Sequence, residues 1–260
     1  MAEFAIGGLA GLGGGLIGVG GGFVMVPLQV LWTRTPQRRA TGTSLAAVIS
    51  ISAVGAAVYY FGKGTPQLDL KVALFVMLGS SVGAILGANL SRLVPERALR
   101  TLVAVLLVLG AAKELHDAVA GSATTLSTGG PGNLGLAGYL LISLCGAVIG
   151  ILSGLVGIGG GILIVPTLVL GFGLGQRVAQ GTSLLAALPT AAIGAAIHHR
   201  NGNVDLASAG RMSLGGIPGV LIGAVVALWL PQRVLAGLFG VVLAVLAVRL
   251  WPRGPTASER

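Results

Sequence analysis

The chain carries one glycine-rich motif twice, each time inside an apolar stretch. GVGGGFVMVP at 18–27 returns as GIGGGILIVP at 157–166, and GTSL at 42–45 returns at 181–184. Both pairs are 139 positions apart (157 − 18 and 181 − 42), so the copies align without a gap across both motifs. Two copies with a glycine break inside an apolar segment are the pattern of transporters that bind their substrate between repeats.

The composition indicates that the chain is solvated by lipid. Hydrophobic residues make up 54% of it and charged residues 9%, against roughly 25% charged in a soluble domain. The uncharged runs reach the ~20 residues that one bilayer crossing requires. Glu3 stands where a signal peptide would be basic, and the first apolar run is too long for one. The sequence predicts an all-α polytopic membrane protein.

We expect two repeats of four apolar segments. The boundaries are a first repeat at 1–120, a linker at 121–133, a second repeat at 134–252 and a mobile basic tail at 253–260. The apolar segments are predicted at 4–33, 42–61, 70–93 and 98–115, and then at 134–173, 181–199, 206–229 and 233–251.

Two further features repeat at a spacing of 136. Glycines at 79, 83 and 87 match those at 215, 219 and 223, and Asp69 matches Asp205. Glycine every fourth residue predicts a helix face that lets another backbone approach closely in lipid. The two aspartates precede helical segments and are predicted to be N-caps.

Charge placement predicts opposite orientations of the two repeats. In the first repeat, arginines gather in the loops at 34–41 and 92–100, which predicts that both are cytoplasmic. In the second repeat the bias reverses, with only Arg177 and Arg233 in the matching loops. Inverted repeats are therefore favoured, with parallel repeats as the alternative. This requires 134–173 to return to its starting side, and a re-entrant hairpin bent at the glycines fits 4–33.

The glycine breaks are the predicted substrate site. Non-helical backbone at membrane depth must be buried or line a wet cavity, and N–H groups entering a helix favour an anion. Ser and Thr hydroxyls, placed as N-caps of the next helices, also donate to anions. The predicted binding residues are Gly20, Gly21, Gly22, Thr43, Ser44, Gly159, Gly160, Gly161, Thr182 and Ser183. Helix packing and ordinary capping are the alternative interpretation. Replacing Gly21 with Val should block transport and leave folding largely intact.

Other polar residues have weaker assignments. Arg38 and Arg177 match across the repeats and are predicted to steer or gate the anion, with topology anchoring as the alternative. His198 and His199 have no histidine counterparts in the first repeat, so we expect them at the membrane interface. No acidic residue stands in the middle of an apolar segment, so a relay of intramembrane acids is not predicted.

The residue inventory argues against several classes. The net charge of +9 comes from basic residues at the ends of apolar runs, which lipid headgroups explain without nucleic acid. One cysteine, Cys145, excludes an internal disulfide. Three histidines and this cysteine are a poor set for a metal or a nucleophile–base pair, so no metal, no cofactor and no enzyme activity are predicted.

The doubled motifs resemble the TauE/SafE family of sulfite exporters. The resemblance rests on the glycine breaks ending in hydrophobic-Pro and on Arg-x-Ala-x-Gly-Thr-Ser-Leu, which reads RRATGTSL at 38–45 and RVAQGTSL at 177–184. NGNVD at 201–205 also resembles the family's Gly-x-Val-Asp element, whereas the first repeat departs from it with GTPQLD at 64–69. The resemblance implies a multi-pass carrier of the prokaryotic inner membrane for sulfite or small organosulfur anions.

Together these features predict a secondary transporter that exports a small sulfur-containing anion by alternating access. An anion channel and a cation-coupled importer of a small oxyanion are the alternatives. The partners are a small anion and membrane lipid, and the substrate, direction, coupling ion and oligomeric state stay open. A site of neutral donors predicts potential-sensitive export in which His198 and His199 are not obligatory.

Overall fold

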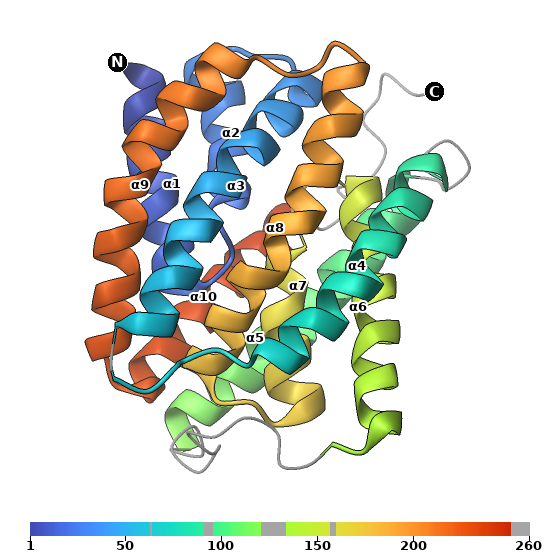
Figure 1. Cartoon of the computed structure of the whole chain (residues 1–260), viewed down its shortest axis with the longest axis vertical. Coiled ribbons are helices and arrows are strands. Elements are labelled where there is room, and N and C mark those ends of the chain that lie inside the picture. Colours follow the sequence, from blue (N-terminus) through green and yellow to red (C-terminus); the bar gives the residue numbers. More distant parts are fainter. Residues whose placement is uncertain (63, 91–95, 121–133, 157–159, 251–260) are drawn as a thin grey trace.

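A computed structural model describes residues 1–62, 64–90, 96–120, 134–156 and 160–250 (Figure 1). The predicted linker at 121–133 and tail at 253–260 lie outside these residues. In the described part, all regular structure is helical. The elements are α1 (Ala2–Ile17), α2 (Gly22–Trp32), α3 (Gln37–Phe61), α4 (Leu70–Leu90), α5 (Glu96–Ala120), α6 (Leu136–Val156), α7 (Gly161–Pro166), the π-helix η2 (Thr167–Gly171), α8 (Gln176–Arg200), α9 (Leu206–Trp229) and α10 (Gln232–Leu250).

Six of the described helices are long and apolar enough to cross a membrane, namely α3, α4, α6, α8, α9 and α10. Their outer faces carry large exposed apolar side chains, such as Leu74, Leu78 and Val82 on one face of α4. Continuous apolar surface of this kind suits lipid and not water. The prediction of an all-α, multi-pass membrane protein is confirmed.

The first apolar segment is a re-entrant hairpin, as its glycines predicted. Helix α1 has 16 residues and is about 24 Å long, shorter than the ~30 Å hydrocarbon core. It ends at Ile17 with Gly18 as its C-cap, which has φ 78°. Gly20 and Gly21 are also left-handed, a conformation that glycine adopts readily. Helix α2 then returns to the end of the molecule where α1 begins. The evidence is that Glu3, at the start of α1, and Arg39, at the start of α3, belong to one polar network.

The equivalent segment of the second repeat is a longer helix followed by a short returning one. Helix α6 has 21 residues, enough for a crossing. It packs in parallel along α4, so its first residues lie at the end where α4 and α8 begin. Helix α7 and η2 lead back toward that end, so the segment 134–173 leaves and returns on the same side (Figure 1).

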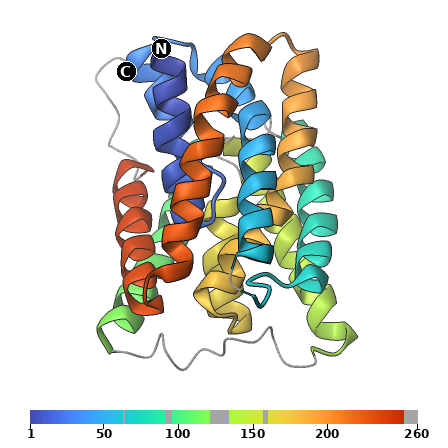
Figure 2. The same ribbon diagram turned by 60° about the vertical axis from the view of Figure 1, so that its left-hand side comes forward.

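The glycine stripes do the packing that their spacing predicted. Gly215, Gly219 and Gly223 of α9 lie against carbonyl groups of α1, and Gly79, Gly83 and Gly87 of α4 lie against carbonyl groups of α6. A Cβ atom on any of the six would stand 1.8–2.3 Å from a carbonyl oxygen, so only glycine permits these contacts. The first helix of each repeat therefore pairs with the fourth helix of the other, as α1 and α9 do in Figure 2.

Helices α3 and α8 pack together in the centre, and each carries a loop of the other repeat. The Asp205 backbone N–H donates to Thr43 Oγ1 at 3.1 Å, and the Asp69 N–H donates to Thr182 Oγ1 at 3.0 Å. A Cβ atom added to Gly42 or to Gly181 would lie 2.3 Å from a carbonyl oxygen in one of the same two loops. Since Thr43 is near the start of α3 and Thr182 near the start of α8, the two helices begin at opposite ends of the molecule (Figure 1).

Three predicted helix boundaries are wrong. Helices α3 and α8 begin at Gln37 and Gln176, and neither N-cap residue makes a side-chain cap bond. The segments before GTSL favour helix, so the helices start a turn earlier and the Thr–Ser pairs are not caps. Helix α5 also runs five residues past the predicted 115 and buries Glu114, whose Cβ is near the Cβ position of Gly240 in α10.

Candidate functional site

A cavity of about 60 Å³ lies between the glycine turns of the two repeats. That volume holds several water molecules. Its lining comes from six helices and two turns: Val19, Gly22, Val26, Ser44, Leu45, Val48, Ala84, Ser153, Gly160, Gly161, Ala187, Thr190, Ala191, Gly194, Ile197 and His198. Both repeats therefore contribute to one site.

The described lining is apolar with a few neutral polar groups. Its polar side chains are Ser44, Ser153, Thr190 and His198, and it includes no Asp, Glu, Lys or Arg. Thr190 Oγ1 lies 2.9 Å from Ser80 Oγ of α4, which ties α8 to α4 beside the cavity. A site of this kind recognises its ligand through hydrogen bonds to uncharged groups.

A buried glutamine fixes Ser44 in place. Gln29 Nε2 of α2 donates to Ser44 Oγ at 2.6 Å and to the Ala40 carbonyl at 3.3 Å. Because the serine oxygen accepts this bond, its own proton stays available to donate. The contact joins α2 to α3 at the cavity wall.

Four of the predicted binding residues line the cavity, namely Gly22, Ser44, Gly160 and Gly161. Gly159 lies outside the described residues. Gly20 faces Ser52 Oγ, and Gly21 packs on the Ala10 carbonyl of α1. Thr43 and Thr182 hold the loops before α9 and α4, and the Ser183 hydroxyl donates to the Gly161 carbonyl at 3.4 Å.

The structure changes what Gly21→Val would test. Gly21 has φ 81°, and a Cβ there would stand 2.4 Å from the Ala10 carbonyl oxygen. A valine would therefore strain the hairpin itself, which disagrees with the expectation of intact folding. Gly160 is the better position, since its nearest neighbour would be 3.5 Å away and its φ of −62° suits any residue.

His198 was missed as a site residue. It was expected at the interface with His199, yet it is half-buried and lines the cavity, whereas His199 is exposed. The signal was its spacing: Thr190, Gly194 and His198 recur every fourth residue and share one face of α8. Reading that face together with the GTSL motif would have found it.

The two matched arginines lie outside the cavity lining. Arg38 is exposed at the start of α3. Arg177 is half-buried and donates to the carbonyl groups of Ala227 and Leu230 at the end of α9. Arg177 thus secures unpaired carbonyls at a helix C-terminus.

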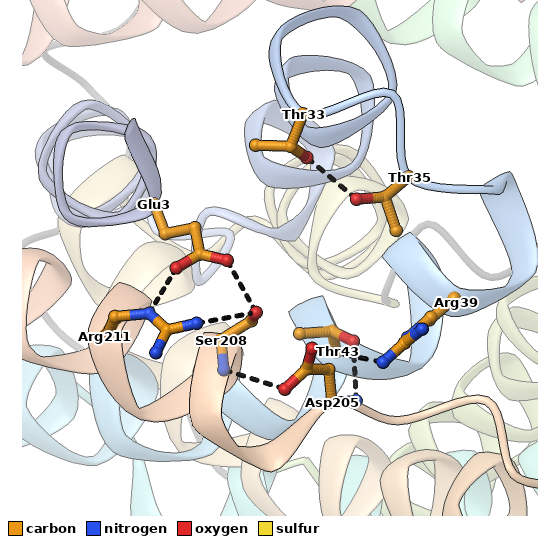
Figure 3. A network of polar contacts seen from close by, with 8 residues as sticks. All are labelled: Glu3, Thr33, Thr35, Arg39, Thr43, Asp205, Ser208 and Arg211. Atoms are coloured by element: carbon orange, nitrogen blue, oxygen red, sulfur yellow. Dashed lines mark hydrogen bonds and ion pairs between the residues drawn. The ribbon is translucent and has the colours of Figure 1, made fainter. Parts of the chain in front are cut away.

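A polar network ties α1, α3 and α9 together at the end where α3 begins (Figure 3). Glu3 accepts from the Ser208 hydroxyl at 2.6 Å and pairs with Arg211, while Arg39 lies 3.2 Å from Asp205. Asp205 caps α9 as predicted, accepting from the Ser208 N–H at 3.0 Å. That backbone bond is the main reason why the pKa of Asp205 is below its usual value. Asp69 caps α4 in the same way, through the N–H groups of Lys71 and Val72.

Within the described residues, no group of three or more His, Cys, Asp or Glu side chains could hold a metal ion. The site therefore consists of a small cavity between two broken helices, inside a bundle with an apolar exterior. This architecture defines the chain as a multi-pass membrane transporter of the broken-helix type.

Comparisons with known proteins identify the family. The model of the family described as "Sulfite exporter TauE/SafE" matches residues 1–114 and 142–260, and the chain belongs to this family. It is similar to the probable membrane transporter protein YunE of Bacillus subtilis (strain 168), with 28% identity over 94% of this chain and 92% of the relative. It is also 30% identical to the probable membrane transporter protein YdhB of the same strain, over 88% of this chain and 87% of that relative. No solved structure matches.

Proposed function

We propose that the protein is a secondary carrier of a prokaryotic inner membrane that exports a small sulfur-containing anion, sulfite or an organosulfonate, by alternating access. The observation that carries the proposal is the cavity between the two glycine breaks. Membership of a family described as sulfite exporters supports the class of substrate.

The cavity's chemistry favours an anion. Gly22 opens α2, and the first N–H groups of a helix have no acceptor within it and carry partial positive charge. Gly160 and Gly161 bring the backbone of the second repeat to the same space, and Ser44 adds a hydroxyl. Among the described residues, the lining has no carboxylate, the group that would favour a bound cation.

The two repeats are proposed to be inverted. The crosswise pairing of α1 with α9 and of α4 with α6 supports this, as does the opposite direction of α3 and α8. Arg34, Arg38 and Arg39 lie at the end where α3 begins, which we propose to be cytoplasmic. Labelling of Arg38→Cys and Arg177→Cys, in a Cys145→Ser background, tests this. Opposite sides are expected, and labelling from one side would mean parallel repeats.

Alternating access is proposed because the cavity extends further along α8 than along the equivalent helix α3. Ala191 lines it, whereas the equivalent Ser52 is completely buried. Ile197 and His198 line it near the end of α8. Tyr59 of α3, the equivalent of His198, is completely buried. A carrier that exchanged the two arrangements would expose its site first to one side and then to the other.

Export of this kind needs no coupling ion. An anion that leaves a cell with a negative interior moves with the potential, by about 2.3 kcal/mol per charge for every 100 mV. A cavity of neutral donors leaves the charge of the anion uncompensated, so the full charge crosses the membrane. Efflux is expected to be sensitive to potential.

Proteoliposomes with a valinomycin-clamped potential test the proposal. The panel is sulfite, sulfate, thiosulfate and small organosulfonates, and Gly160→Val is the variant that fills the cavity. We expect saturable sulfite or sulfonate efflux that slows when the receiving side is made negative, and we expect it to be lost in Gly160→Val. Large ohmic single-channel currents would instead identify an anion channel, and flux that requires a Na⁺ or proton gradient would identify a coupled importer.

A further inference from the structure

His198 packs against the first repeat at the cavity wall. A Cβ on Gly42 of α3 would lie 2.8 Å from His198 Cβ and 3.1 Å from Cγ, so the absence of a side chain at Gly42 makes room for the ring. The His198 carbonyl accepts the Asn203 N–H at 2.9 Å, which fixes the backbone where α8 ends. His198 therefore stands at the cavity wall with its Cβ and Cγ against α3.

The two ring nitrogens have different surroundings. Nδ1 is buried and has no hydrogen-bond partner among the described residues, while the residue lines the cavity. Nε2 is therefore the ring nitrogen assigned to a ligand in the cavity. A neutral imidazole protonates one nitrogen and leaves a lone pair on the other. A proton on Nδ1 would be a buried donor with no acceptor, so the tautomer with the proton on Nε2 is favoured. His198 thus offers an N–H donor to the cavity.

The other polar side chains of the lining do not replace His198 as a hydrogen-bond donor on α8. Thr190 is engaged with Ser80 and the Ala186 carbonyl, and Ser44 accepts from Gln29 and keeps one proton to donate. Ser44 on α3 and His198 on α8 therefore place donors on two walls of the same space. A ligand with several acceptor oxygens around one centre fits two such walls.

We propose that His198 is a substrate-contacting residue that selects oxyanions, through a hydrogen bond from Nε2–H to an oxygen of the bound anion. This rests on the proposed transport of sulfur oxyanions and adds the residue that recognises the oxygen.

Equilibrium binding of radiolabelled sulfite to the purified full-length protein tests the assignment. His198→Leu and His198→Phe remove the donor, His198→Gln keeps an N–H of similar reach, and the exposed His199→Leu is the matched control. A hydrogen bond to a charged group corresponds to a loss of affinity of about tenfold to a hundredfold. We expect this loss in His198→Leu and His198→Phe, substantial recovery in His198→Gln, and unchanged affinity in His199→Leu. In proteoliposomes the loss should appear in KM more than in kcat.

The outcomes separate this assignment from the proposed function. Wild-type protein that neither binds nor transports any anion of the sulfur panel would refute the function, and with it the present assignment. If a monodisperse His198→Leu or His198→Phe variant bound sulfite with the affinity of the wild type, the role of His198 would be overturned and the proposed function would stand. Equal losses in His198→Leu and His198→Gln would also overturn it, because the ring would then matter for packing and not as a donor.

Discussion

Tyr59 and His198 occupy equivalent positions in the two repeats, 139 residues apart, but in different surroundings. The Tyr59 ring is fully buried, and its hydroxyl lies 3.0 Å from both the Gly15 carbonyl oxygen and Gln180 Oε1. His198 is half-buried, lines the cavity and leaves Nδ1 without a partner among the described residues. In the proposed carrier, Tyr59 therefore marks a sealed end and His198 marks an open end.

The glycine turns of the two repeats differ in the same way, because one is packed and the other lines the cavity. Gly21 has a φ of 81° and is packed against α1, whereas its equivalent Gly160 has a φ of −62° and lines the cavity. The two repeats differ at many positions, while the glycine and threonine contacts that join them are kept. The comparison teaches that the shared contacts build the fold and that the differing ones decide which residues line the cavity.

The largest expected effect comes from breaking a contact that both repeats share. Gly42→Val and Gly181→Val each push a side chain into a carbonyl oxygen of the opposite loop, at 2.3 Å from the Cβ position. Overpacking typically costs about 1–3 kcal/mol, and the rigid backbone neighbour places both variants at the upper end of that range. Both should lower the midpoint of thermal unfolding in detergent, by similar amounts. Gly171→Val is the control, because nothing lies within 4 Å of its Cβ position. A large loss in only one of the two would show that the shared contacts are not equivalent.

The sealed end should open when Tyr59 loses its hydroxyl. Tyr59→Phe leaves the Gly15 carbonyl and Gln180 without this donor, a loss of about 1–3 kcal/mol for buried partners. Reaction of a thiol at Ser52→Cys, on the same end of α3, should become faster in this variant. Tyr60→Phe is the adjacent control and should leave the rate unchanged. Equal rates in Tyr59→Phe and the parent would remove Tyr59 from the seal.

The smallest effect is expected at the exposed cap of α9. Folding lowers the pKa of Asp205, so its ionised cap stabilises the fold above the ordinary value of 3.8 and is lost as pH falls through the lower folded value. Asp205→Asn should lower thermal stability slightly at neutral pH, because an amide caps a helix nearly as well and an exposed ion pair with Arg39 contributes ~0–1 kcal/mol. The difference between variant and parent should shrink below pH 3.8. A difference that grows on acidification would contradict the assignment.

The sequence predicts most of the fold because its signals are local. Apolar runs, glycine spacing and the doubled register give the segments, the re-entrant first hairpin and the packing stripes. Contacts across the repeats do not follow from local pattern: Thr43 accepts from a residue 162 positions away, and nothing near it in the sequence distinguishes that role from capping. Site prediction from the sequence found Gly22, Gly160, Gly161 and Ser44 at the cavity, and missed His198 because the first repeat has no histidine counterpart.

The central claim, that the two repeats open in turn, is tested most directly by thiol accessibility. The equivalent positions are compared as Ala191→Cys and Ser52→Cys, each in a Cys145→Ser background. Both sites are small and buried, and one lines the cavity while the other lies in its sealed counterpart. With a membrane-impermeant thiol reagent, Ala191→Cys should react from the side of Arg38, and Ser52→Cys should react from the opposite side and faster during sulfite turnover. Reaction of both positions from the same side, or rates at Ser52→Cys that do not respond to sulfite, would contradict a carrier whose two repeats open in turn.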